Sequence, residues 1–469
     1  MTTQEYQIGM VGLGVMGRNL VLNIADHGFS VSGYDKDLAK VQELQKEAGS
    51  RSIKAAQSLD EFVGALSTPR VVMMLVPAGP AVDSVIRDLL PYLEKGDLII
   101  DAGNSHFSDT DLRAKTLAEK ELLYMGVGVS GGEEGARHGP SMMPGGPKEA
   151  YERVRPILEA AAAHVAGDPC VTYLGRGSAG HYVKMVHNGI EYGLMELIAE
   201  TYDLMKRGLG LSNDELADVY AGWNRAELNG YLMEITAHIF RKVDDRTGKR
   251  LIDLILDEAK QKGTGMWTSQ DAMDIQVPTP VIDAAVVARN LSALKSEREA
   301  ANQVFNGPRT RLDGNRDEVL AQIKGAMVAA MILTYAQGMA LLHCASGEYQ
   351  YGLNLEDVAR IWRGGCIIRA ALLEEIRAAF HASPKLSNLL MDEHLGQAVL
   401  ARLGDLRAVV GLAAQHGVPA PCLMASLAYF EGYRSAWLPA NLIQAQRDDF
   451  GAHTYERVDD KGVFHTHWD

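Results

Sequence analysis

Four polar side chains lie at helical spacing in an otherwise apolar stretch near the middle of the chain. Lys184, His187, Asn188 and Glu191 occupy positions i, i+3, i+4 and i+7. At about 100° per residue these positions share one face of a helix, over roughly 10 Å of its axis. The remaining positions are mainly apolar, which indicates a buried helix whose polar stripe faces a cleft or a partner.

This stripe has two interpretations. One is a set of i,i+4 surface contacts, each worth on the order of a few tenths of a kcal/mol. The other is a general base with a general acid nearby. Gly177 and Gly180 precede the helix, as expected where a backbone must approach a ligand. Because the helix dipole and burial both disfavour a charged Lys184, this amine can accept a proton, and Glu191 can donate one.

A glycine-rich loop near the N-terminus carries a second chemical signal. Gly12, Gly14 and Gly17 form a G-x-G-x-x-G pattern between a predicted strand at 7–13 and a predicted helix, and Asp35 ends the next predicted strand. Such glycines let a pyrophosphate reach the helix N-terminus, and the acidic residue binds the adenosine ribose. The pattern predicts a dinucleotide site, although these residues alone also suit FAD or S-adenosylmethionine. The expected loop residues are Gly12, Leu13, Gly14, Val15, Met16 and Gly17.

The elements that must position these groups divide the chain into three parts. Up to about residue 175, strands alternate with helices, which predicts an α/β, doubly wound parallel sheet of the Rossmann type. Helical patterns then dominate and predict a large all-α domain; they cover 182–206, 213–240, 251–262, 280–306 and 317–343. From about residue 437 helical periodicity is lost, while aromatic residues favour a tail that docks on its own chain or on a partner. The predicted parts are 1–178, 179–436 and 437–469.

The helical part carries an internal repeat. Residues 211–222 match residues 353–364 at an offset of 142, with acidic, alanine and glycine positions in common. Similarity at a fixed offset is typical of duplicated helical units.

The composition excludes several classes of protein. Hydrophobic residues make up 47% and charged residues 23%, as in folded soluble proteins, and a formal charge of −14 opposes the wrapping of nucleic acid. No apolar run reaches the roughly 18 residues of a membrane span, and no secretory signal is recognisable. The four cysteines form no C-x-x-C pair, and no helix sets metal ligands beside the polar stripe. We therefore expect a cytoplasmic protein that binds no metal, membrane or nucleic acid.

Seven motifs occur in order along the chain. They lie at residues 12–20, 101–105 (Asp-Ala-Gly-Asn-Ser), 129–137, 139–146, 180–193, 262–265 (Lys-Gly-Thr-Gly) and 450–456. Together they make the chain resemble the decarboxylating 6-phosphogluconate dehydrogenases, in their long-chain form, over essentially its whole length. The broader β-hydroxyacid dehydrogenases share the first glycine loop, the Ser-Gly-Gly motif and the Lys…Asn helix. They lack the duplicated helical half and the tail.

The resemblance implies the oxidative decarboxylation of 6-phosphogluconate to ribulose 5-phosphate in the pentose phosphate pathway. Lys184 would take the proton of the C3 hydroxyl as hydride leaves for the nicotinamide, and would then stabilise enolate charge as CO2 departs. Glu191 would protonate C1 of the enediol. The implied contacts to the substrate carboxylate and hydroxyls are Asn104, Ser130, Gly131, Gly132, His187 and Asn188. The implied phosphate contacts are Tyr192, Lys262, Thr264, Arg289, Arg447 and His453. The last two imply a homodimer whose C-terminal tails are exchanged between subunits.

Cofactor choice depends on the residues after the second predicted strand. NADP-dependent relatives have Asn-Arg-Thr or Asn-Arg-Ser, whereas this chain has Asp35, Lys36 and Asp37. A carboxylate there accepts hydrogen bonds from a 2′-hydroxyl but repels a 2′-phosphate. We therefore predict a preference for NAD, with NADP as the alternative because Lys36 supplies a counter-charge.

The rest of the expected cofactor set follows the later strands: Val76, Pro77, Ala78 and Asn104. Many family members have Ala at position 14, Gly at 102 and Lys at 77 and 266. None of these departures removes a proposed catalytic group; they bear on cofactor choice.

Two other functions are compatible with parts of the pattern. One is a β-hydroxyacid dehydrogenase for an unphosphorylated hydroxy acid, and the other is a non-catalytic NAD-dependent sensor. A missing phosphate-site residue would favour the first, and loss of Lys184 or Glu191 would favour the second. The sequence retains both sets.

Overall fold

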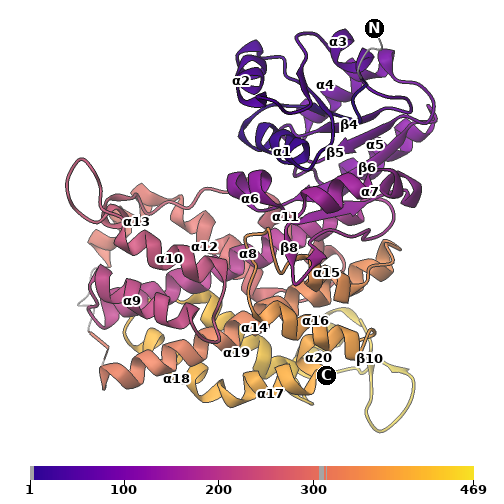
Figure 1. Ribbon diagram of the computed structural model, residues 1–469. Coiled ribbons are helices and arrows are strands. Elements are labelled where there is room, and N and C mark those ends of the chain that lie inside the picture. Colours follow the sequence, from indigo (N-terminus) through magenta and orange to yellow (C-terminus); the bar gives the residue numbers. More distant parts are fainter. Residues whose placement is uncertain (1–4, 306–310, 313, 469) are drawn as a thin grey trace.

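The chain folds into a sheet-based unit that lies against a larger helical unit (Figure 1). The computed structural model describes residues 5–305, 311–312 and 314–468. Three predicted bounds lie outside the described residues. They are the start of the first part at residues 1–4, the end of the helix 280–306 and the end of the tail at residue 469.

The N-terminal unit is built on a seven-stranded sheet in the order β3-β2-β1-β4-β5-β6-β7. The strands are β1 (Ile8–Val11), β2 (Val31–Tyr34), β3 (Ile53–Ala55), β4 (Val71–Met74), β5 (Leu98–Asp101), β6 (Leu123–Val129) and β7 (Met142–Gly145). The helices are α1 (Val15–Asp26), α2 (Leu38–Ala48), α3 (Leu59–Gly64), α4 (Pro80–Leu89), α5 (Phe107–Ala118), α6 (Gly132–His138) and α7 (Lys148–Ala161). Apolar cores on both faces explain why the central strands read as continuous apolar runs.

The strand order places the ligand end of this sheet. From β1 the chain adds β2 and β3 on one side, and it then adds β4 and the later strands on the other side, so the direction of strand addition reverses between the parallel neighbours β1 and β4. Loops that follow these two strands therefore meet at the carboxyl edge, where doubly wound sheets bind ligands.

The predicted all-parallel sheet is correct for six strands and wrong for the seventh. β7 runs antiparallel to β6. The connecting helix α6 has 7 residues, as does β6. A helix of that length rises about 10 Å, whereas such a strand spans about 23 Å, so α6 cannot return the chain to the far end of the sheet.

Two two-residue strands, β8 (His164–Val165) and β9 (Asp168–Pro169), precede the second unit, whose described elements up to Tyr433 are all helices. It contains α8 (Ala179–Asp203), α9 (Asn213–Asn224), α10 (Tyr231–Arg241), α11 (Thr264–Asp274), α12 (Pro280–Ser292), α13 (Lys295–Val304), α14 (Arg316–Glu348), α15 (Leu355–Ile361), α16 (Leu372–Ala382), α17 (Glu393–Ala401), α18 (Leu403–Gln415) and α19 (Pro421–Tyr433). Three predicted helices differ: 213–240 divides into α9 and α10, 280–306 divides into α12 and α13, and 251–262 forms only a 3-10 turn at Leu251–Leu254.

The repeat is visible in the helix starts. The N-caps of α9 and α15 are Ser212 and Asn354, which lie 142 residues apart, the offset of the sequence match. Each is preceded by a long core helix, α8 or α14, and followed by a helix that packs on it, α10 or α16.

Helix α14 is the central core helix of this unit. It has an 18-residue window of mean hydropathy 1.6, long and apolar enough to cross a membrane, yet 94% of that window is buried inside the protein. The expectation that no stretch reaches the composition of a span is therefore wrong for α14. Burial against α8, α18 and α19 accounts for its apolar character.

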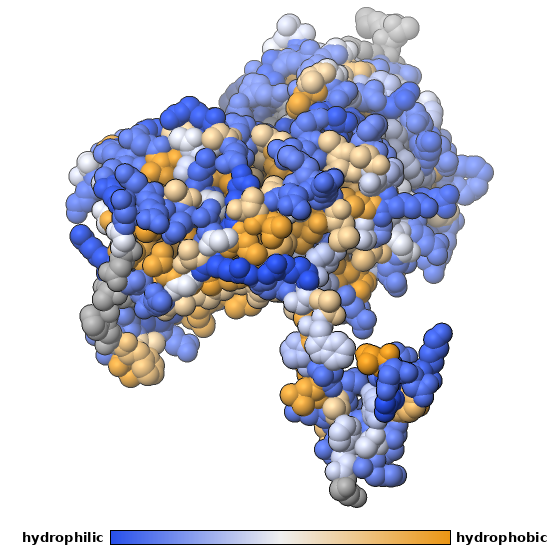
Figure 2. Space-filling view, turned by 90° about the horizontal axis from the view of Figure 1, so that it is seen from below, coloured by the Kyte–Doolittle hydropathy of each residue, from blue (hydrophilic) through white to orange (hydrophobic). Residues whose placement is uncertain are grey.

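The predicted non-helical tail is also corrected. It contains helix α20 (Ala440–Gly451), followed by the short strands β10 (Tyr455–Glu456) and β11 (Val463–Phe464). The carboxylate of Asp448 organises this segment, because it accepts hydrogen bonds from the Thr454 and Thr466 amides and from the Trp468 indole. Seen from below, the C-terminal segment projects from the body (Figure 2).

Candidate active site

The glycine loop after β1 has the geometry of a pyrophosphate cradle. Gly12 adopts a φ of +96°, and a Cβ there would lie 2.5 Å from the Leu75 carbonyl oxygen. A Cβ on Gly17 would lie 1.9 Å from the Gly12 oxygen, so α1 packs directly on the loop. A Cβ on Gly14 would meet nothing within 4 Å, which leaves room for a ligand above the N-terminus of α1.

Asp35 ends β2 beside this loop. One oxygen accepts the Leu13 amide at 2.8 Å and the other accepts the Asp37 amide at 2.9 Å. The carboxylate therefore joins the glycine loop to the next turn, at the edge of a cavity of about 890 Å³ that α4 closes. Lys36, at the same edge, pairs with Asp88 of α4 at 2.7 Å.

A second cavity, of about 860 Å³, connects the sheet unit to the helical unit. It is lined from the sheet by Gly14, Val15, Met16, Gly17, Val76, Pro77, Ala78 and Asn104, and from the start of α11 by Lys262, Thr264 and Trp267. The structure thus brings most of the predicted cofactor set together with two of the predicted phosphate contacts.

Lys184 lies on α8 against the sheet. A Cβ on Gly128 of β6 would lie 2.3 Å from the Lys184 Cβ, so this glycine makes the space for the lysine. The amine donates to Asn188 Oδ1 at 2.8 Å. Burial lowers the pKa of Lys184, while the charge of Glu191 acts in the opposite direction. A lowered pKa increases the fraction of neutral amine that can accept a proton.

Gly180 does not have the expected role. A Cβ there would lie 2.2 Å from the Met143 oxygen and 2.4 Å from the Gly126 oxygen. This glycine therefore lets α8 lie on the backbone of β6 and β7; no ligand need approach it.

Asn188 and His187 connect the helix to both walls of the cleft. Asn188 Oδ1 also lies 3.0 Å from His187 Nδ1, and its amide donates to Thr264 Oγ1 at 3.0 Å. His187 Nε2 lies 3.3 Å from Ser130 Oγ. Burial, and then the Lys184 charge, hold the pKa of His187 well below its ordinary value. A neutral His187 with its proton on Nδ1 accounts for both contacts.

Glu191 lies one turn further along α8 at the solvent side of the cleft. Its side chain is 22% exposed, and one oxygen lies 3.9 Å from His187 Nδ1. Burial raises the pKa of Glu191, against the opposing charges of Lys184 and Arg289. The Arg289 guanidinium stacks 3.5 Å above the ring of Tyr192, so the phosphate contacts predicted on α8 and α12 are adjacent.

Two predicted phosphate contacts are not brought to this cleft by the same chain. Arg447 lies on α20 and its guanidinium contacts Gln444, while the His453 ring lies against Phe450. Both belong to the projecting C-terminal segment (Figure 2).

Sequence reasoning missed three residues of the site. Gly128 shapes the lysine site, and its only signal was a glycine at alternate positions of a strand. His106 and Trp267 line the second cavity, with ring centroids 5.0 Å apart. Trp267 follows the Lys-Gly-Thr-Gly motif closely enough that the motif could have indicated it.

The fold and the site are those of an oxidoreductase that binds a nicotinamide dinucleotide on a Rossmann-like sheet, against which a helical domain packs. Residues 7–175 match the NAD binding domain of 6-phosphogluconate dehydrogenase, and residues 180–468 match the 6-phosphogluconate dehydrogenase C-terminal domain. The chain therefore belongs to the 6-phosphogluconate dehydrogenase family.

Individual relatives agree over the full length. The chain is 53% identical over 465 residues to the NADP(+)-dependent, decarboxylating 6-phosphogluconate dehydrogenase of Bacillus subtilis, covering 99% of each chain. It is 50% identical over 465 residues to the decarboxylating enzyme of Escherichia coli K12, again covering 99% of each. The solved 6-phosphogluconate dehydrogenase of Plasmodium falciparum superimposes with a TM-score of 0.96 at 45% identity, covering 98% of this chain and 100% of that one. That protein was solved alone, with its cofactor NADP+ and with its substrate 6-phosphogluconate.

Proposed function

We propose that the chain catalyses the NAD(P)-dependent oxidative decarboxylation of 6-phosphogluconate to ribulose 5-phosphate and CO2, a step of the pentose phosphate pathway, in the cytoplasm. The observation that supports this most directly is the face of α8. It presents Lys184 and Glu191, with their pKa values shifted in opposite directions, and its Asn188 donates to Thr264, which lines a cavity together with the glycine loop. The full-length match to decarboxylating relatives leaves no support for an unphosphorylated hydroxy acid as substrate.

The chemistry uses the two sides of the cleft. A nicotinamide cofactor, held by the glycine loop and the other residues that line the second cavity, would supply the acceptor for the C3 hydride. Neutral Lys184 takes the proton of the C3 hydroxyl, which produces a 3-keto acid. Because a β-keto acid supplies its own electron sink, CO2 leaves without a metal, and the Lys184 ammonium stabilises the enolate oxygen. Glu191, whose pKa is raised by burial, then delivers a proton to C1 of the enediol, the carbon that carried the carboxylate.

The remaining side chains have positioning roles in this proposal. Asn104, Ser130, Gly131, Gly132, His187 and Asn188 hold the substrate carboxylate and hydroxyls. Tyr192, Lys262, Thr264 and Arg289 hold the phosphate, and Arg447 and His453 complete that site from the neighbouring subunit of a homodimer. Lysine and arginine are suited to a phosphate dianion because their hydrogen bonds to it are charge-assisted.

A direct assay tests the activity. Purified protein is incubated with 6-phosphogluconate and each nicotinamide cofactor, with no added metal. It should reduce the cofactor, followed by the absorbance of the reduced nicotinamide, and release about one CO2 for each cofactor reduced. Cofactor reduction without CO2 release, or turnover of unphosphorylated gluconate at an equal kcat/KM, would contradict the proposal.

We expect NAD to be the preferred cofactor. At about 4 Å and an effective dielectric of about 20, a carboxylate and a phosphate repel by on the order of 4 kcal/mol per unit charge. Asp35 supplies this carboxylate, and Lys36 is paired with Asp88. The measurement is the ratio of kcat/KM for NAD and NADP, in the wild type and in Asp35→Asn/Lys36→Arg, where it should move towards NADP. A wild-type ratio in favour of NADP, which the Bacillus subtilis relative uses, would show that Asp35 does not face the ribose.

A further inference from the structure

The segment at the end of α15, residues 361–366, reaches the catalytic cleft from the second helical repeat. It lies about 230 residues from the Ser130 loop in the sequence and packs against it. We call this stretch the 361–366 segment. It touches the cleft on two sides and is held by a charged network outside it.

On the side of the sheet unit, the segment contributes backbone oxygens to the contacts. The Ser141 amide donates to the Gly365 oxygen at 2.7 Å, and the Ser141 hydroxyl donates to the Ile361 oxygen at 2.8 Å. A Cβ on Gly131 would lie 2.5 Å from the Gly365 oxygen. The Ser130 amide in turn donates to the Ser141 oxygen at 3.0 Å, so the segment fixes the backbone of the proposed substrate loop.

On the side of α8, the segment contacts His187, one of the residues proposed to bind the substrate. The fully buried Trp362 lies edge-on to the His187 ring, with centroids 5.6 Å apart at an interplanar angle of 75°. His187 Nε2 lies 3.3 Å from Ser130 Oγ. The contacts therefore form a closed ring, the circuit, which runs from the 361–366 segment to Ser141, Ser130 and His187 and returns to the segment through Trp362.

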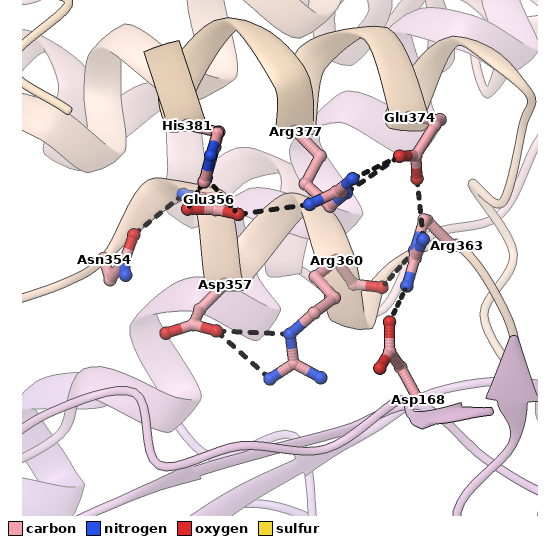
Figure 3. A network of polar contacts seen from close by, with 9 residues as sticks. All are labelled: Asp168, Asn354, Glu356, Asp357, Arg360, Arg363, Glu374, Arg377 and His381. Atoms are coloured by element: carbon pink, nitrogen blue, oxygen red, sulfur yellow. Dashed lines mark hydrogen bonds and ion pairs between the residues drawn. The ribbon is translucent and has the colours of Figure 1, made fainter. Parts of the chain in front are cut away.

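Arg363 anchors the segment to both units (Figure 3). Its guanidinium pairs with Asp168 of β9 at 2.8 Å and with Glu374 of α16 at 2.6 Å, and the side chain is only 10% exposed. Because two carboxylates and limited solvent access restrict its geometry, this arginine is more than a mobile surface charge. Arg377 lies in the same network, but within the described part of the chain its ion pairs are with Glu356 and Glu374, both in the helical unit (Figure 3).

We propose that Arg363 is a positioning residue, which sets the Ser130–Gly132 loop against His187 by clamping the 361–366 segment between β9 and α16. Arg363 lines neither of the two cavities that the glycine loop lines; in this proposal it acts through Ser141, Ser130 and Trp362. The inference rests on the proposed function, since Ser130 and His187 matter as ligands of 6-phosphogluconate.

The test separates substrate from cofactor. In Arg363→Met we expect kcat/KM for 6-phosphogluconate to fall about 10- to 100-fold, because a displacement of about 1 Å at a reacting group has effects of this size. The dissociation constants of NAD and NADP, measured by calorimetry, should stay within about twofold, since the glycine loop lies outside the circuit. Arg363→Lys, which keeps the charge, should recover part of the loss.

Two further variants control for loss of folding. Asp168→Asn removes the partner of Arg363 on the sheet unit and should lower kcat/KM for 6-phosphogluconate as Arg363→Met does. The double variant Asp168→Asn/Arg363→Met should lose no more than Arg363→Met alone, because the two residues act as one unit. Arg377→Met removes an arginine of the same network and should leave kcat/KM for 6-phosphogluconate unchanged. Equal losses in Arg363→Met and Arg377→Met, or a parallel loss of cofactor binding, would overturn the inference.

Substrate binding is measured separately from turnover, by calorimetry with 6-phosphogluconate. A wild type that binds 6-phosphogluconate without oxidising it would contradict the proposed function, while weaker binding in Arg363→Met would still support the positioning role. Unchanged binding and unchanged kcat/KM in Arg363→Met would overturn the positioning role alone.

Discussion

Replacing Lys184 by Met is expected to lower kcat by about 100- to 10,000-fold, the usual contribution of a general acid–base group. Glu191→Gln should have a loss of the same order, because it removes the proton donor for C1. The fold should persist in Lys184→Met, since a buried methionine carries no desolvation cost. Steady-state kinetics and thermal unfolding measure the two effects. Lys206→Met, on the turn that follows α8, is a matched control and should retain activity.

The pH profile gives an independent measure of the base. Only neutral Lys184 can accept a proton, so kcat/KM should fall on the acid side as the amine becomes protonated. Burial lowers the pKa of Lys184 and the charge of Glu191 raises it. In Glu191→Gln, the acid limb of the residual activity should therefore shift to lower pH. Near-normal turnover in Lys184→Met would contradict the assignment of Lys184 as the base. So would an acid limb of kcat/KM that is the same in Lys184→Met as in the wild type.

Removal of the C-terminal segment after Pro439 should abolish substrate binding and leave cofactor binding largely intact. Arg447 and His453 lie on this segment, and the same chain does not place them in its own cleft. Large apolar side chains are exposed along it, including Leu442 (61%), Ile443 (60%) and Phe450 (74%), which is typical of an interaction surface. We therefore expect the truncated chain to form a weaker dimer as well. Calorimetry with each ligand and sedimentation analysis make these measurements.

Mixing two inactive chains tests the exchange of tails. Arg447→Ala keeps Lys184, and Lys184→Met keeps Arg447, so a hybrid dimer contains one complete site. Random reassortment of equal amounts should restore roughly a quarter of the wild-type activity, because half of the dimers are hybrids and each has one functional site of two. If mass spectrometry shows hybrids and no activity returns, each site is built within one chain.

The spacing of residues along one element was sufficient to predict the polar face of α8 and the glycine loop. Lys184 and Glu191 share a face because a helix has a fixed period, and the loop follows β1 because the glycines have a local conformational role. Spacing alone also overestimated the helical content of 251–262, because it does not show whether an apolar face is packed against another element. Leu251, Leu254 and Ile255 have helical spacing, but Leu254 and Ile255 are exposed, and short helices without a packed face are marginal.

Contacts between distant elements were decided only by the tertiary structure. Gly128 makes space for Lys184, Thr264 binds Asn188, and Ser141 binds the 361–366 segment, because packing brings together residues that lie dozens to hundreds of positions apart. The tail shows the same division. Its aromatic residues indicated docking, but helix α20 escaped prediction because its order depends on Asp448, whose hydrogen-bond partners come from a later part of the chain. Local periodicity thus fixed which side chains share a face, while the distances that allow chemistry came from packing between elements that no sequence period relates.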